Sequence, residues 1–178
     1  REGEMTIVHF SNPQGPVIDT LLNSCRSVEN NSWLAGGVGD LRFATETGYQ
    51  FWQKLLHDNL GSRRGFDTWV MYFNRKPISY CVTFTTGTIR YIIANQFDQQ
   101  FRKYSTGSVL YFHVFKQCPT AGVRQVDFAP GDIHYKGRWG GKEEAMHFDA
   151  FIFAPGLKGQ ILTQALKTLQ FTKKTLQS

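Results

Sequence analysis

The chain has 178 residues, a length that suits one domain with a full core. Hydrophobic residues make up 41% and charged residues 19% of the sequence, which argues against a disordered chain. No run of about 18 apolar residues is present, so we expect no membrane span.

The formal net charge is +6, which favours an anionic partner: nucleic acid, anionic lipid or a phosphate-bearing cofactor. The basic residues are scattered, and their densest clusters are the pairs Arg63-Arg64, Arg102-Lys103 and Lys173-Lys174. We therefore expect a polyphosphate cofactor rather than nucleic acid.

The three cysteines, Cys25, Cys81 and Cys118, are odd in number and widely spaced. This pattern predicts free thiols in a reducing compartment, and thus a cytoplasmic protein. Neither the cysteines nor the five histidines show metal-ligand spacing, so we expect no metal.

The first part of the chain predicts two helices and a glycine-rich loop. The expected elements are an edge strand over 5–10, helices over 17–28 and 45–60, and an irregular loop over 30–39. Trp33 lies in this loop, and we weigh two interpretations of it. Its indole either folds back on the core or forms a wall of the ligand cleft.

The rest of the chain predicts a meander of three strands, followed by helices alternating with strands. The expected strands cover 68–73, 78–85, 89–94, 124–128 and 146–153, and the expected helices 108–118 and 157–173. This order indicates the α+β class, a mixed sheet with helices on both faces. The connection from 89–94 through a helix to 124–128 is long enough for a right-handed parallel crossover.

A polar turn over 104–108 opens the helix 108–118. The unpaired N–H groups at a helix start, together with the positive end of the helix dipole, favour an anion such as a phosphate.

A spaced set of motifs carries a family resemblance. It comprises the Ser32-Trp33 loop, a strand pair ending at Tyr91, the turn over 104–107, and Val126-Asp127-Phe128 followed by Gly131, Tyr135-Lys136 and Trp139. The set resembles the GNAT-type acyltransferase domain linked to cellulose and exopolysaccharide biosynthesis. The relatives of that domain are the Fem-type peptidyltransferases, which use aminoacyl-tRNA.

The chain departs from this family at two positions. Thr106 stands where the family usually has a proline between serine and glycine, and Leu34 stands where it usually has a lysine after the tryptophan. Family members are often about twice this length, with two GNAT-like halves. We therefore expect residues 1–178 to form a single GNAT-like domain, the C-terminal half of a longer chain.

The resemblance implies transfer of an acyl group from acyl-CoA, acetyl-CoA or longer, to the amine of a small molecule. It places the cofactor between the strands 89–94 and 124–128, against the backbone of Ile93 and Ala94. The pyrophosphate would lie on the backbone of Ser105, Thr106, Gly107 and Ser108. The acceptor would be a metabolite, a sugar or a cell-envelope precursor.

The resemblance also suggests catalytic and acceptor-binding residues. Asp127 is either the general base or a structural aspartate that caps a turn or pairs with Lys136. Tyr135 either protonates the leaving thiolate or packs in the core. Lys136 either binds an acidic acceptor or forms a salt bridge, and Trp33 and Tyr91 would line the acceptor site.

Two alternatives remain open. One is a Fem-type transferase that binds tRNA, although the long helical insertion that Fem proteins use for tRNA is absent from the sequence. The other is a non-catalytic GNAT module in a larger protein.

Overall fold

The computed structural model describes residues 3–36, 41–58, 65–129, 136–142 and 155–176, and the side chains of the last segment up to 168. The chain divides into two compact units, Arg1–Trp139 and Gly140–Ser178. Each unit is described by itself.

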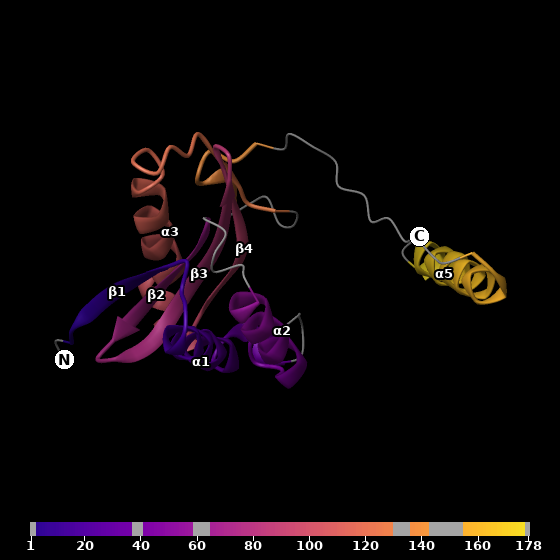
Figure 1. Cartoon of the computed structure of the whole chain (residues 1–178), viewed down its shortest axis with the longest axis horizontal. Coiled ribbons are helices and arrows are strands. Elements are labelled where there is room, and N and C mark those ends of the chain that lie inside the picture. The colour runs from indigo at the N-terminus through magenta and orange to yellow at the C-terminus, as the bar shows by residue number, and fades with distance from the viewer. Residues whose placement is uncertain (1–2, 37–40, 59–64, 130–135, 143–154, 177–178) are drawn as a thin grey trace. The chain divides into compact units, whose positions relative to one another are not determined.

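The first unit is built on a five-stranded sheet in the order β1-β2-β3-β4-β5 (Figure 1). Neighbouring strands from β1 to β4 are antiparallel, and β5 pairs with β4 in parallel. The strands are β1 (Met5–Ser11), β2 (Phe66–Phe73), β3 (Lys76–Thr86), β4 (Ile89–Phe97) and β5 (Gln125–Asp127). The predicted edge strand, three-strand meander and parallel crossover are confirmed.

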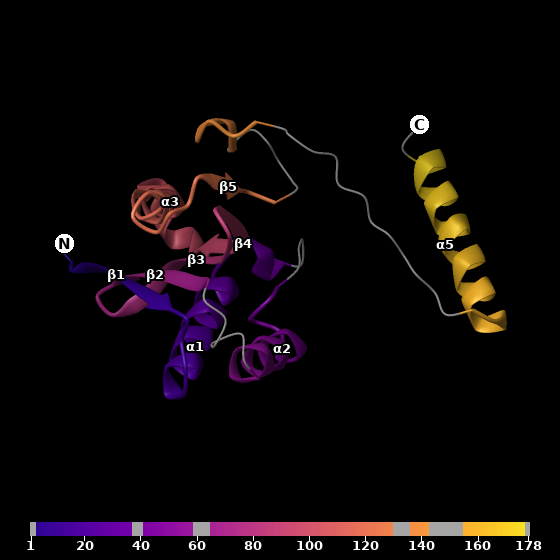
Figure 2. The ribbon, with the colours of Figure 1, turned by 45° about the horizontal axis from the view of Figure 1, so that its top comes forward.

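Helices cover both faces of this sheet, because side chains alternate between the two faces along each strand. Val70 of β2 and Val82 of β3 pack with α1 (Pro16–Asn30) and α2 (Glu46–His57). Trp69 of β2 packs on the opposite face with α3 (Thr106–Lys116). Figure 2 shows α3 on one side of the strands, with α1 and α2 on the other. The α+β class is confirmed.

The described part of this unit also contains the short 3-10 helices η1 (Trp33–Gly36) and η3 (Gln99–Tyr104). The prediction of an irregular loop over 30–39 is wrong for Trp33–Gly36. The Ala35 N–H donates to the Ser32 carbonyl at 3.2 Å, and such local bonds close a tight turn despite the nearby glycines. Residues 37–40 lie outside the described part.

The second unit contains α5 (Leu157–Leu176), which confirms the predicted final helix. The strand predicted over 146–153 lies outside the described residues. Among the described helices, none is both long and apolar enough to cross a membrane.

Candidate active site

The strands β4 and β5 separate after a short paired segment. Their paired residues are Ile89 with Gln125, Arg90 with Val126, and Tyr91 with Asp127. β5 then ends, whereas β4 continues to Phe97. Beyond Tyr91, the edge of β4 that faced β5 therefore carries backbone N–H and C=O groups that can pair with an extended ligand.

Contacts with α3 explain why β5 turns away from β4. Phe128, directly after β5, packs edge-to-face on Tyr111 and Phe115 of α3, with ring centroids 5.9 and 5.8 Å apart. Ala129 follows with a φ of 57°, and its N–H donates to Asp127 Oδ1 at 2.7 Å. The chain thus bends toward α3, whereas β4 continues to Phe97.

A β-bulge lies in β4 at the same place. Val82 of β3 pairs with Ala94, whereas the next residue, Thr83, pairs with Ile92, so Ile93 has no partner on β3. Ile93 and Ala94 both pack toward the α1 and α2 face. A bulge bends the strand and redirects its backbone groups, and bulges are frequent next to active sites. The side chain of Arg42 donates a hydrogen bond to the Ile93 carbonyl.

The turn that is predicted to bind an anion lies at the start of α3. Ser105 adopts a left-handed backbone, with φ 53° and ψ 38°, and no side chain caps the helix. Thr106 is buried and its Oγ1 has no hydrogen-bond partner among the described residues, so its side chain points into the fold. Gly107 carries no side chain, and Ser108 is exposed. The first N–H groups of the helix have no acceptor within it, which is the arrangement that favours an anion such as a phosphate.

The structure brings Asp127 and Tyr91 together, since they are paired residues at the last rung before the strands separate. Asp127 is half-buried and holds the turn at Ala129 through one carboxylate oxygen. Lys136 is buried, and its ammonium donates to the Ala129 carbonyl. No ion pair among the described residues joins Asp127 to Lys136. Tyr135 lies outside the described residues.

Trp33 begins η1, two residues after a contact with the segment that follows β4. The carbonyl of Asn31 accepts a hydrogen bond of 2.9 Å from the N–H of Gln99, which holds the start of this loop beside the end of the strand. Trp33 is 52% exposed, whereas its neighbour Leu34 is buried. The structure therefore does not fold Trp33 back on the core, and the indole is accessible to a ligand.

Sequence reasoning missed Glu29 and Arg42. Glu29 is buried, and its carboxylate accepts hydrogen bonds from the N–H groups of Arg42, Phe43 and Ala44 at 3.2, 2.7 and 2.9 Å. It also accepts one from the Tyr80 hydroxyl at 2.7 Å, and burial together with this carboxylate raises the pKa of Tyr80 well above its usual range. One signal was present in the sequence: Glu29 lies four residues after Cys25, on the apolar side of its helix.

The three cysteines are free, as predicted, and all three are buried. Burial raises the pKa of the Cys25, Cys81 and Cys118 thiols, which keeps them protonated. In the described part of the chain, no group of three or more His, Cys, Asp and Glu side chains could hold a metal ion.

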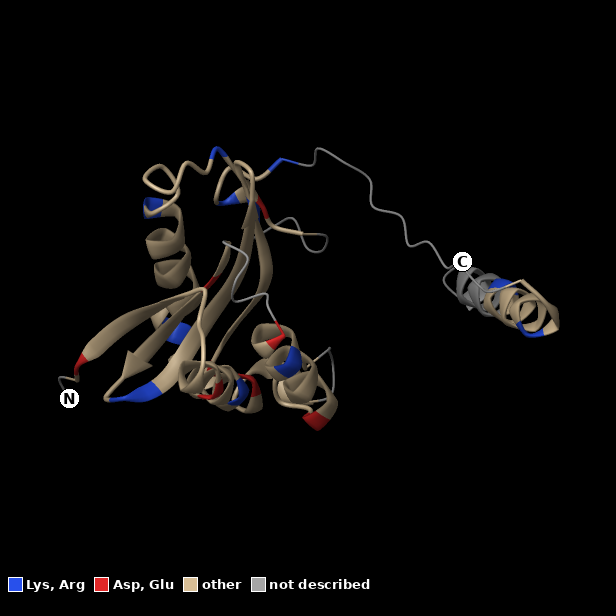
Figure 3. Ribbon diagram, in the orientation of Figure 1, with Lys and Arg blue, Asp and Glu red and all other residues tan. Residues whose placement is uncertain are grey.

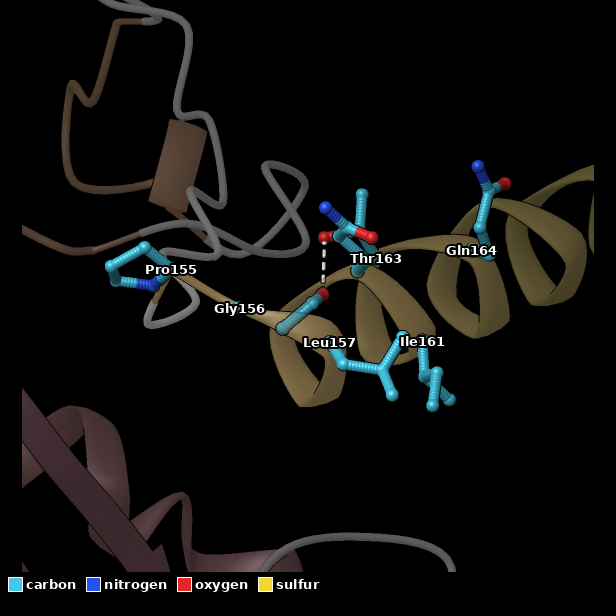
Figure 4. A pocket seen from close by; sticks show the side chains of 8 residues that line it. Pro155, Gly156, Leu157, Ile161, Thr163 and Gln164 are labelled. Carbon is cyan, nitrogen blue, oxygen red and sulfur yellow. Dashed lines mark hydrogen bonds between the residues drawn. The ribbon is translucent and has the colours of Figure 1, made fainter.

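The second unit has an open hollow at the start of α5, which Figure 4 shows from close by. Thr163 donates a hydrogen bond of 2.8 Å to the Gly159 carbonyl there. None of its lining residues is titratable; they are Pro155, Gly156, Leu157, Gly159, Gln160, Ile161, Thr163 and Gln164. The hollow offers no acid or base for catalysis.

Comparisons with known proteins agree with this geometry. No curated protein sequence matches the chain. A solved GCN5-related N-acetyltransferase from Ralstonia eutropha JMP134 aligns with a TM-score of 0.62 and 16% identity, covering 83% of this chain and 99% of that one. An aminoglycoside acetyltransferase from an uncultured soil metagenomic sample, in complex with sisomicin, aligns with a TM-score of 0.58 and 15% identity over 84% and 97% of the two chains.

An aminoglycoside N-acetyltransferase in complex with CoA aligns with a TM-score of 0.54 and 12% identity, covering 86% of this chain and 97% of that one. At these identities the likeness to solved structures shows the fold. The family comes from the sequence itself, because the model of the family described as Acetyltransferase (GNAT) domain matches residues 2–137. The chain belongs to this family of acyltransferases, as the sequence predicts.

Proposed function

We propose that this protein transfers an acyl group from acyl-CoA to an amine of a small molecule. The observation that carries the proposal is the open edge of β4, which begins where β5 ends and leads through η3 to the start of α3. The similar structures include one in complex with CoA and one in complex with the aminoglycoside sisomicin, which supports this pairing of cofactor and acceptor.

The cofactor is held along this edge. The N–H of Ile93 and the backbone of Ala94 pair with the amides of the pantetheine arm, in the manner of an added strand, while the Ile93 carbonyl accepts the hydrogen bond of Arg42. The N–H groups at the start of α3, from Ser105 to Ser108, bind the pyrophosphate, and the helix dipole adds to this attraction. Arg102 and Lys103, exposed in the last turn of η3, add positive charge.

The acceptor amine reacts beside the last rung of the β4–β5 pair. Asp127 removes a proton from the amine as the general base, and Tyr135 protonates the leaving thiolate. Trp33 and Tyr91 line the acceptor side, and Lys136 adds positive charge there. Acyl-CoA supplies the activated carbonyl.

Within the GNAT family, we place the chain in the branch linked to cellulose and exopolysaccharide biosynthesis, which is related to the Fem-type transferases. The Ser32-Trp33 loop and Trp139 carry this placement. A tRNA-binding Fem-type activity predicts a continuous basic surface. In Figure 3 the described Lys and Arg residues are instead spread over several elements. The buried free thiols support a cytoplasmic location.

Thermal unfolding with and without acetyl-CoA and longer acyl-CoAs tests the proposal. A ligand at a hundredfold excess over its dissociation constant stabilises the native state by about 2.7 kcal/mol. We expect acyl-CoA to raise the unfolding temperature. The dependence of this rise on the length of the acyl chain indicates which acyl groups the pocket accepts.

Two matched variants identify the cofactor site. Arg102→Gln should reduce the rise in unfolding temperature that acyl-CoA causes. Arg124→Gln removes the same charge next to Thr88, before β4 begins, and should leave this rise unchanged. No shift with any acyl-CoA would contradict the proposal and favour the tRNA-dependent or non-catalytic alternative.

A further inference from the structure

The backbone of Arg42 is fixed from two sides. Its N–H donates to the buried carboxylate of Glu29 at 3.2 Å, and the same carboxylate holds the next two residues. On the other side, a Cβ placed on Gly48 of α2 would lie 2.2 Å from the Arg42 carbonyl. The Arg42 backbone can therefore pack this closely only because Gly48 has no side chain. The position of the Arg42 Cα, from which the side chain extends, is fixed as a result.

The Arg42 side chain reaches the bulge of β4, where it donates to the Ile93 carbonyl. Arg42 is nevertheless exposed, and none of the ion pairs among the described residues includes it. Two acids of the described part lie close in sequence or space and have other partners: Glu29 accepts four hydrogen bonds, and Glu46 pairs with Arg26 at 3.0 Å. A guanidinium has five N–H donors in a planar fork, so donors remain for a ligand.

The location of Arg42 separates it from the cofactor phosphates. Ile93 packs toward the α1 and α2 face of the sheet, whereas α3 covers the opposite face. The start of α3 is the anion site that suits the pyrophosphate. Phe43, the residue after Arg42, packs in the same cluster as Ile93, so Arg42 approaches the bulge from the α1 and α2 face, the side that remains for the second substrate.

We propose that Arg42 recognises an anionic group, a carboxylate or a phosphate, on the amine acceptor. This inference rests on the proposed acyltransferase function and names its substrate class. The planar guanidinium pairs with either group through two parallel hydrogen bonds, which also orients the ligand. The fixed backbone of Arg42 limits the movement of the side chain, and its bond to the bulge places the acceptor beside the acyl carbonyl.

Binding of matched amines tests this proposal. The probes are glucosamine 6-phosphate against glucosamine, and 4-aminobutyrate against 4-aminobutanamide, titrated into the protein with and without saturating CoA. We expect the wild-type protein to bind the anionic member of at least one pair about tenfold or more tightly than its neutral partner, because hydrogen bonds to charged groups are the stronger ones. A preference in the glucosamine pair would indicate that Arg42 binds a phosphate, and a preference in the aminobutyrate pair that it binds a carboxylate.

Arg42→Gln should abolish this preference and leave binding of the neutral probes unchanged. Arg42→Lys keeps the positive charge but loses the planar set of N–H donors of the guanidinium. This variant should retain part of the preference for the anionic probe. Arg124→Gln, which removes an exposed arginine outside the site, should retain all of it. These variants keep the main-chain bond to Glu29, so their folding should be preserved.

Three results would overturn the proposal. The first is equal binding of both members of each pair, or binding of neither, by the wild-type protein. The second is retention of the preference in Arg42→Gln. The third is weaker CoA binding in that variant, which would place Arg42 on the cofactor. If the proposed acyltransferase function itself is wrong, the wild-type protein should bind no CoA. This result separates that failure from a failure of the proposal for Arg42.

Discussion

The hydroxyl of Tyr80 donates a hydrogen bond of 2.7 Å to the carboxylate of Glu29, inside the core between α1 and the sheet. Three backbone N–H groups of the segment from Arg42 to Ala44 complete the shell of donors around this carboxylate. A buried charge is tolerated when all of its acceptor sites are used. The arrangement links the end of α1 to β3 and to the segment that carries Arg42.

Glu29→Gln should destabilise the protein by about 3 kcal/mol, because the amide NH₂ would face N–H and O–H donors in place of an acceptor. Urea unfolding measures the effect. Glu46→Gln is the matched control, since Glu46 forms an exposed pair with Arg26, and it should cost about 0.5 kcal/mol or less. Equal losses in the two variants would mean that the Glu29 carboxylate is not the anchor of this segment.

Gly48→Ala should reverse the usual effect of this substitution in a helix. Alanine is normally about 1 kcal/mol more favourable than glycine there. The added Cβ, however, would lie 2.2 Å from the Arg42 carbonyl and 2.8 Å from Thr45 Oγ1, so we expect a loss of about 2 kcal/mol. Thr47→Ala, at an exposed position in the same turn, should be neutral or slightly stabilising. Thermal unfolding compares the two, and a stabilised Gly48→Ala protein would refute the close contact.

A buried ion pair between Asp67 and Arg90 predicts a pH dependence. Burial alone would raise the pKa of Asp67, but hydrogen bonds from His9 and Ser11 and the charges of His9 and Arg90 outweigh it and lower the pKa. The oxygen Asp67 Oδ2 lies 3.5 Å from Arg90 Nη2, and Arg90 is only 3% exposed.

The lowered pKa of Asp67 means that its ionised form stabilises the fold. This contribution is present above the ordinary aspartate pKa of about 3.8 and is lost as the pH falls through the lower value in the folded state. Asp67→Asn leaves Arg90 buried without its counterion, so it should cost about 3 kcal/mol at pH 7. The difference from the wild type should shrink below pH 3.8.

Urea unfolding between pH 7 and pH 2 follows this difference. Asp58→Asn, at an exposed position at the end of α2, serves as the control and should give a curve parallel to that of the wild type. A constant gap between Asp67→Asn and the wild type across the whole pH range would show that ionisation of Asp67 does not matter.

The sheet and most helices could be predicted because their apolar residues repeat with the period of the element. The ends of the elements lack this signal. The sequence predicts that β4 stops at Ala94, because Asn95-Gln96-Phe97 is largely polar, yet the strand continues to Phe97. Pairing with β3 carries it on, since Gln96 lies opposite Tyr80 and Phe97 opposite Ser79. Long-range pairing of this kind leaves no local signal in the sequence.

The candidate site could be predicted only where its parts are local. The turn before α3 and the aspartate at the end of β5 are sequence features and were found. The bulge at Ile93 depends on the register between two strands, and the contact of Arg42 with it joins residues far apart in the chain. Such relationships require the fold, which is why Arg42 and Glu29 were missed.

The turn before α3 also shows a limit of residue preferences. Glycine is the residue that most readily adopts a left-handed backbone, and Gly107 lies in the turn predicted over 104–108. The structure instead gives Ser105 the positive φ of 53° and places Gly107 inside the helix. We therefore expect Ser105→Gly to stabilise the ligand-free protein by about 1 kcal/mol, because a left-handed backbone strains an L-residue.

Gly107→Ala is the companion variant. A Cβ at Gly107 would meet only the ring of Phe97, at an ordinary contact distance of 3.7 Å. This substitution should therefore also stabilise the ligand-free protein, by up to about 1 kcal/mol. Thermal unfolding measures both, and destabilisation by Gly107→Ala would mean that the glycine, rather than Ser105, adopts the left-handed conformation.

Asp127→Asn separates the catalytic from the structural interpretation of this residue. Asparagine keeps an Oδ1 that accepts the N–H of Ala129, so the turn at the end of β5 should survive. It cannot accept a proton as a general base, so kcat should fall by about 10²- to 10⁴-fold. The acetyl-CoA-dependent rise in unfolding temperature should be unchanged, because the proposed cofactor contacts lie on β4 and α3.

Asp127→Ala is the matched variant, since it removes both the base and the acceptor of the turn. If Asp127 is the base, the two variants should share the loss of kcat, while only the alanine variant loses stability, by about 1 kcal/mol. Wild-type kcat in Asp127→Asn would contradict the catalytic role and leave Asp127 as the residue that ends β5. That outcome would still be compatible with a cofactor held along the open edge of β4, because the thermal shift tests that edge separately.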